Sequence, residues 1–335
     1  MLWAEHVARN TAQERDDVFA EAKCQFDEAE LVELTAVCGL FAQSNRFQDS
    51  LLLPIEEQNE VNKIGVSIRV NTDRLKAYIE RIVANWPAEF PVPEQDAAPP
   101  RSSARRDAAP ARDVSLIGPA RITLPDPMTA QGDAGWFLET AGRLLGGVPN
   151  AVRMWAHIPH LGKLFLPFHA AFMYEGLGSR LPSALKALAL VRTSYVNRAP
   201  YSLAHRRALG RAAGLTDEQL DLVAEDDCAA SPQFSVRQRA ALAWTELVAR
   251  NTAKHRDDVY QEIRAHFDDS QVVELTGLCA ISSKVDRIQN ALRIPLESHA
   301  EIQALYRSPS LDPAHLKRYL AEIAENWPRQ FPDPR

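Results

Sequence analysis

Residues 244–260 read WTELVARNTAKHRDDVY, and residues 3–19 read WAEHVARNTAQERDDVF. The likeness continues without a gap, so that 3–91 aligns with 244–332 at a constant offset of 241 residues. Roughly 40 % of the paired positions are identical, and a shared period of this length without insertions indicates one supersecondary unit used twice.

The two copies differ in what precedes them. About a hundred residues of helical pattern lie before Trp244, whereas two residues lie before Trp3. The sequence therefore predicts a half-module over 1–91 and a full domain over 116–335. Between them, 92–115 reads VPEQDAAPPRSSARRDAAPARDVS, which has no apolar period and predicts a flexible linker.

Outside the linker almost every segment has a helical pattern. Residues 181–197 are apolar nearly all round, which predicts a buried helix, and the next helix is expected from Pro200 to Arg211 with Gly214 just past its end. Capping boxes are expected at Thr216 with Gln219 and at Ser235 with Gln238. Further helices are expected over 257–267, 270–292 and 314–326. The fold class predicted is an all-α bundle.

Composition narrows the possible classes of function. The chain has 335 residues and a formal net charge of −6 without a long basic run, so we expect no nucleic-acid partner. No run of eighteen apolar residues occurs, so we expect no membrane span. The start, MLWAEHVARN, lacks the apolar core of a signal peptide, and the four cysteines form no C-x-x-C pair. We expect reduced thiols and a cytoplasmic location.

The strongest chemical candidate is the junction LVRTSYVNRAPYSLAHRRALGRAAGL, residues 190–215. Tyr201, Ser202, His205 and Arg206 are spaced so that all four can border one cleft near a helix N-terminus. The helix dipole there disfavours imidazolium, which predicts a neutral His205 able to accept a proton. Arg206, and Arg192 on the preceding helix, are candidates for holding a carboxylate. The alternative is an ordinary polar face of an amphipathic helix.

This junction resembles the core signature of the carboxymuconolactone decarboxylase and alkylhydroperoxidase D family. Asn197, Tyr201 and His205 fit the cysteine-free form of the signature, with YSLAH where YEWAH is common, and AHIPHLGKLF (156–165) is similar to the first helix of the family. The resemblance spans about 145–332. It implies an AhpD-like helical bundle and a lyase that needs no organic cofactor.

The chain departs from the peroxidases of that family at four positions. Ala199 and Ser202 stand where they carry cysteines, Ala187 where they carry a relay glutamate, and Arg206 where they carry a relay histidine. Peroxide reduction in such enzymes needs a thiolate pair, so the resemblance does not extend to peroxidase activity.

The sequence contains two other patterns of chemical interest. His157, His160 and His169 form H-x-x-H-x8-H, but Pro167 interrupts the stretch and no acidic residue is placed to orient the imidazoles, so we expect no metal site. Arginine recurs at the same point of both copies, as Arg46 in SNRFQ and Arg287 in VDRIQ. Such an arginine can tie helices together or line a cleft, and its presence in the half-module favours the tie between helices.

Two hypotheses follow. In the first, the chain is an enzyme that binds a small carboxylated lactone or related acid through Arg206, Arg192, Ser202 and Asn197, while His205 and Tyr201 move a proton. In the second, it is a catalytically degenerate relative that serves as a binding or oligomerisation protein. Under both hypotheses we expect a homo-oligomer.

Overall fold

The computed structural model describes all residues except 1, 65–70, 95–117, 329–330 and 332–335. Most of the linker expected over 92–115 therefore lies outside the described residues. The described residues form helices and connecting loops, and their one β-bridge joins Glu175 to Ser310. The prediction of an all-α fold is confirmed for this part of the chain.

The helices of the N-terminal copy of the repeat are α1 (Leu2–Arg9), α2 (Asp16–Lys23), α3 (Glu28–Ser50), α4 (Gln58–Val61) and α5 (Thr72–Ala84). Those between the copies are α6 (Gly132–Leu145), α7 (Asn150–Trp155), α8 (Pro159–Met173), α9 (Ser183–Val196), α10 (Pro200–Ala212) and α11 (Asp217–Val223). The C-terminal copy begins within α12 (Val236–Arg250) and continues through α13 (Asp257–His266), α14 (Asp269–Leu292), α15 (His299–Leu305) and α16 (Pro313–Glu325).

The capping and helix-ending signals in the sequence form the local structures that they predict. Both predicted capping boxes form, with the Thr216 hydroxyl accepting from the Gln219 amide and the Ser235 hydroxyl accepting from the Gln238 amide. Gly214 follows α10 with φ of +87°, a conformation that costs glycine little. The helix predicted over 181–197 is α9, and it is buried along most of its length between α10, α12 and α14.

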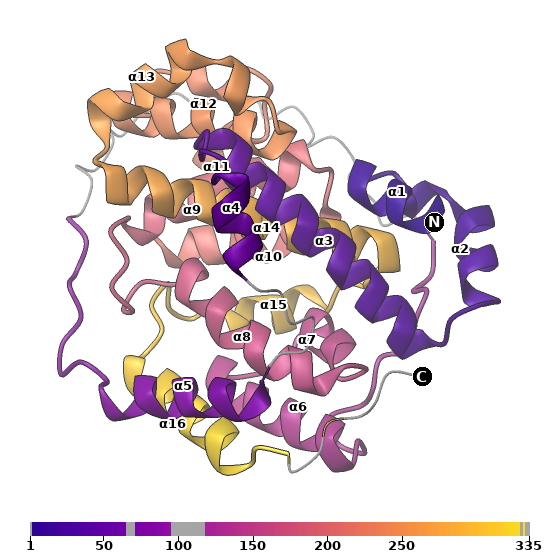
Figure 1. The fold of residues 1–335 in the computed structure, drawn as a ribbon. Coiled ribbons are helices and arrows are strands. Elements are labelled where there is room, and N and C mark those ends of the chain that lie inside the picture. The colour runs from indigo at the N-terminus through magenta and orange to yellow at the C-terminus, as the bar shows by residue number, and fades with distance from the viewer. Residues whose placement is uncertain (1, 65–70, 95–117, 329–330, 332–335) are drawn as a thin grey trace.

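Equivalent helices of the two copies pack against each other. Helix α3 lies along α14, and α5 lies beside α16 (Figure 1). Each copy also repeats the same buried hydrogen bond: the indole nitrogen of Trp3 donates to Thr35, and that of Trp244 donates to Thr276, both at 3.0 Å. The same residues thus build the same local structure 241 positions apart.

The repeated arginines cross between the copies. Arg46 on α3 donates to the backbone oxygen of Ala249 at 3.1 Å, and Arg287 on α14 donates to that of Ala8 at 3.3 Å. Since Arg46 corresponds to Arg287 and Ala8 to Ala249, the contacts are reciprocal, as in a two-fold symmetric interface. Both side chains tie helices together, which confirms the interpretation drawn from the sequence.

Candidate functional site

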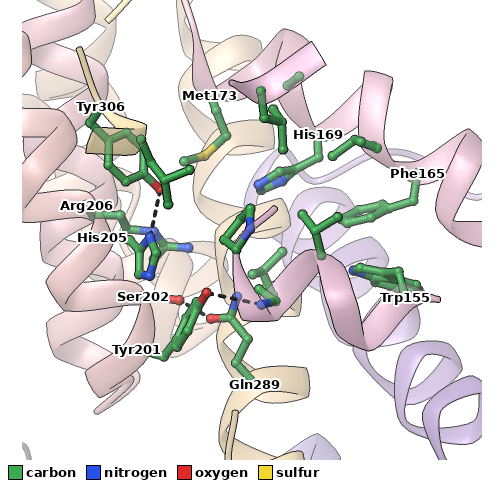
Figure 2. A pocket seen from close by; sticks show the side chains of 18 of the residues that line it. Trp155, Phe165, His169, Met173, Tyr201, Ser202, His205, Arg206, Gln289 and Tyr306 are labelled. Carbon is green, nitrogen blue, oxygen red and sulfur yellow. Dashed lines mark hydrogen bonds between the residues drawn. The ribbon is translucent and has the colours of Figure 1, made fainter. Parts of the chain in front are cut away.

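A cavity of about 110 Å³ lies beside α10, between it and helices α7 and α8. Figure 2 shows its polar wall, where Tyr201, Ser202, His205 and Arg206 project from α10. Opposite them, α7 and α8 supply an apolar wall that includes Trp155, Phe165, Leu166 and Met173. The cavity therefore combines a mainly apolar lining with a few convergent polar groups, as small-molecule sites do.

His205 has a partner on each ring nitrogen. Its Nε2 lies 2.8 Å from a carboxylate oxygen of Glu297, and its Nδ1 lies 3.1 Å from the hydroxyl of Tyr306. The side chain is buried, so these two contacts fix the orientation of the ring. A carboxylate that holds one nitrogen of an imidazole is an arrangement typical of acid–base catalysis.

The carboxylate of Glu297 accepts several hydrogen bonds. Besides His205, it accepts from the Tyr201 hydroxyl at 2.9 Å and from the backbone N–H of Asn150. Burial alone would raise the pKa of Glu297, but the hydrogen bonds from His205 and Asn150 outweigh it and lower the pKa below its usual value. Glu297 is therefore ionised at neutral pH.

Tyr201 stacks on the His205 ring with centroids 4.4 Å apart. Its hydroxyl accepts from the backbone N–H of Ala151 at 3.1 Å and donates to Glu297. Burial, followed by the charge of Glu297, raises the pKa of Tyr201 well above its ordinary value. The phenol stays neutral and positions both the ring of His205 and the carboxylate of Glu297.

Arg206 and Ser202 line the cavity but are already engaged. Arg206 forms an ion pair with the fully buried Asp286 at 2.9 Å and donates to the Ser194 hydroxyl. The Ser202 hydroxyl donates to the side-chain oxygen of Gln289 at 2.6 Å. The positive charge of Arg206 is thus largely offset by Asp286, which reduces its pull on a substrate carboxylate.

The structure does not bring Arg192 to the cavity. Its guanidinium donates to the backbone oxygens of Val223 and Glu225 and pairs with Glu246 at 2.6 Å. It therefore anchors α9 to the loop after α11. Asn197 also lies outside the cavity lining, where its amide donates to Asp286 at 2.9 Å and to Ser283 at 3.2 Å.

The three histidines of the H-x-x-H-x8-H pattern lie in different surroundings. His157 contacts the backbone oxygen of Thr123 at 2.8 Å, and His160 lies 3.5 Å from Asp133. Only His169 lines the cavity, from α8 (Figure 2). Within the described ranges, no cluster of three metal-ligating side chains is present.

Four residues of the site were missed by the sequence reasoning: Glu297, Tyr306, Asp286 and Gln289. All four lie more than 80 positions after His205, so no local spacing relates them to it. The repeat also gave no signal for Glu297, because the equivalent glutamate, Glu56, occurs in the copy where it has no histidine partner. Their part in the site comes from the packing of α14 and the loops around α15 against α10.

The carboxymuconolactone decarboxylase family matches residues 159–247, which include α8 to α11 and therefore Tyr201 and His205. This match supports the resemblance to that family over these residues. A relative from Escherichia coli (strain K12), described as uncharacterized protein YnjA, is 26 % identical over 162 residues, which are 48 % of this chain and 86 % of the relative.

Two solved structures are similar over part of the chain. An alkylhydroperoxidase AhpD core structure, of an uncharacterized peroxidase-related protein from Ralstonia eutropha JMP134, has a TM-score of 0.47 and 21 % identity, covering 57 % of this chain and 98 % of that one. The debrominase Bmp8 has a TM-score of 0.41 and 17 % identity, covering 56 % and 91 %. Among the described helices, none combines the length and apolar character needed to cross a lipid bilayer.

Proposed function

We propose that this member of the carboxymuconolactone decarboxylase family is a cofactor-free lyase that acts on a small carboxylated lactone or a related acid. The observation that carries the proposal is His205, held between Glu297 and Tyr306 at the wall of the cavity. All four cysteines are free thiols, which supports the further proposal of a cytoplasmic location.

The lining of the cavity suits loss of carbon dioxide. A carboxylate placed among Trp155, Phe165 and Leu166 loses much of its hydration, and an apolar environment disfavours its localised charge. Departure of carbon dioxide leaves an enolate, whose charge is spread more widely. Arg206 supplies the part of its positive charge that Asp286 does not offset, and the His205–Glu297 pair supplies the proton that completes the product.

The test is a panel of γ-lactone carboxylates and β-keto acids, with release of carbon dioxide as the readout. We expect wild-type protein to act on one or more of these probes and His205→Gln to lose about 10²–10⁴-fold in kcat. The matched control is His255→Gln, because His255 is exposed and is not one of the residues that line the cavity. Equal turnover by His205→Gln and His255→Gln would remove His205 from the mechanism.

A second candidate function is favoured by the reciprocal packing of α3 on α14. In this alternative the chain is catalytically degenerate, and the N-terminal copy acts as a built-in partner of the family domain within a homo-oligomer. Gly39 permits the close approach, since an added Cβ would lie 3.0 Å from Ile288 and 3.2 Å from Lys284. Gly39→Leu should push α3 off α14, and light scattering would then report a change of oligomeric state. An unchanged state would count against this alternative.

A further inference from the structure

The hydrogen bonds around His205 leave neither ring nitrogen free for a substrate. Nε2 faces the carboxylate of Glu297, which can only accept, so Nε2 carries the proton. In the neutral ring Nδ1 is then an acceptor, and Tyr306 donates its hydroxyl proton to it at 3.1 Å. A proton exchanged between His205 and a molecule in the cavity has to pass through Tyr306 or displace it.

We infer that Tyr306 is the catalytic residue that touches the substrate, and that His205 and Glu297 form the proton relay behind it. The inference rests on the proposed function and specifies how its proton moves. Tyr306 lies in the connection between α15 and α16, and its ring meets that of His205 edge to face, 5.7 Å between centroids. Figure 2 shows its hydroxyl directed to His205 at the cavity wall.

The surroundings of Tyr306 favour the neutral phenol. Burial raises the pKa of Tyr306 well above its ordinary value, and the nearby Tyr174 and Glu297 act in the same direction. A phenol that keeps its proton at neutral pH can donate it to a developing carbanion. It then needs a neighbour that restores the proton, and Nδ1 of His205 occupies that place.

The step balances for a decarboxylation. The bond between the substrate carbon and its carboxyl group breaks, carbon dioxide leaves, and the electron pair stays on the carbon. For this step Nδ1 of His205 first takes a proton from water, so that the Tyr306 oxygen accepts from Nδ1 and the Tyr306 hydroxyl proton is free to turn to the substrate. Tyr306 then gives its hydroxyl proton to that carbon while His205 passes the Nδ1 proton to the Tyr306 oxygen. His205 ends neutral with Nε2–H still bonded to Glu297, and it regains a proton from water.

The hydrogen bond itself is tested without any substrate. In full-length protein labelled with ¹⁵N in its histidine rings, the His205 signals are assigned by their loss in His205→Gln. We expect Tyr306→Phe to shift the Nδ1 signal of His205 away from its hydrogen-bonded position. Tyr174→Phe is the matched control, because Tyr174 also lines the cavity without contacting His205. An Nδ1 signal unmoved by Tyr306→Phe would overturn the relay.

The catalytic role is tested on the same panel of γ-lactone carboxylates and β-keto acids. We expect Tyr306→Phe to lower kcat about 10²–10⁴-fold with little change in KM, and the double variant with His205→Gln to lose no more than either single variant. Full turnover by Tyr306→Phe with loss in His205→Gln would overturn the relay and leave the proposed function standing. Absence of any wild-type turnover would count against both.

Discussion

In the C-terminal copy of the repeat, Leu278 and Ile281 on α14 are 0 % and 1 % exposed, and α9 packs against this helix. In the N-terminal copy their counterparts on α3, Val37 and Leu40, are 43 % and 45 % exposed. The residues remain apolar in both copies, but no helix among the described residues covers Val37 and Leu40 as α9 covers α14. The equivalent helix face is therefore buried in the core in the C-terminal copy and exposed at the surface in the N-terminal copy.

The comparison extends to chemistry. Helix α10, which carries Tyr201 and His205, follows α9 and lies outside the stretch that is repeated. Glu297 and Glu56 are equivalent positions, yet only Glu297 has a histidine to hold. The repeated unit thus supplies part of the candidate site, and α10 gives one of its two equivalent carboxylates a histidine partner.

The largest difference in stability between the copies is expected from truncating the equivalent apolar residues. Ile281→Ala should lower the free energy of unfolding by about 2–5 kcal/mol, because it leaves a cavity in a close-packed core. Leu40→Ala should cost less than about 1 kcal/mol, because almost half of that side chain already contacts water. Urea unfolding of both variants checks this, and equal costs would show that α3 is covered in solution.

A second difference concerns Lys284, whose counterpart is Gln43. Lys284 is buried over the Phe165 ring at 4.0 Å, and burial lowers its pKa from 10.5 to about 8. Below pH 8 the folded protein bears the whole cost of burying this charge, so Lys284→Gln should raise the free energy of unfolding by about 3 kcal/mol at pH 7.

The pH dependence of that gain follows from the same pKa values. Between pH 8 and 10.5 the unfolded chain still holds the lysine proton while the folded protein has lost it, so wild-type stability rises relative to the variant. The difference in the free energy of unfolding between Lys284→Gln and the wild type should disappear by about pH 10.5. A gain that is constant from pH 7 to 10.5 would show that the cost has another origin.

The smallest difference is expected where the copies are alike. Thr35→Val and Thr276→Val each leave a buried tryptophan N–H without its acceptor, which should cost about 1–2 kcal/mol. Because both hydrogen bonds are 3.0 Å long and both threonines are fully buried, the two costs should agree. Denaturant titration of the two variants measures this, and a clear inequality would break the equivalence of the copies.

The helices and the polar wall of the cavity could be predicted from the sequence, because both depend on residues that are close together in the chain. Capping boxes and apolar periods are local signals, and the spacing of Tyr201, Ser202, His205 and Arg206 follows from one helix. The sequence did not predict that Arg192 faces the loop after α11. Nearly every residue of α9 is buried, so the pattern of apolar residues does not show which way each side chain of this helix points. Nor could it pair His205 with Glu297, because that contact joins residues 92 positions apart.

The most direct test of the account compares the two equivalent carboxylates. Glu297→Gln and Glu56→Gln are the same chemical change at matched positions of the repeat, and release of carbon dioxide from the γ-lactone carboxylates and β-keto acids is measured for both. The account predicts that Glu297→Gln loses at least about 10²-fold in kcat while Glu56→Gln matches the wild type. Equal turnover by the two variants would contradict it.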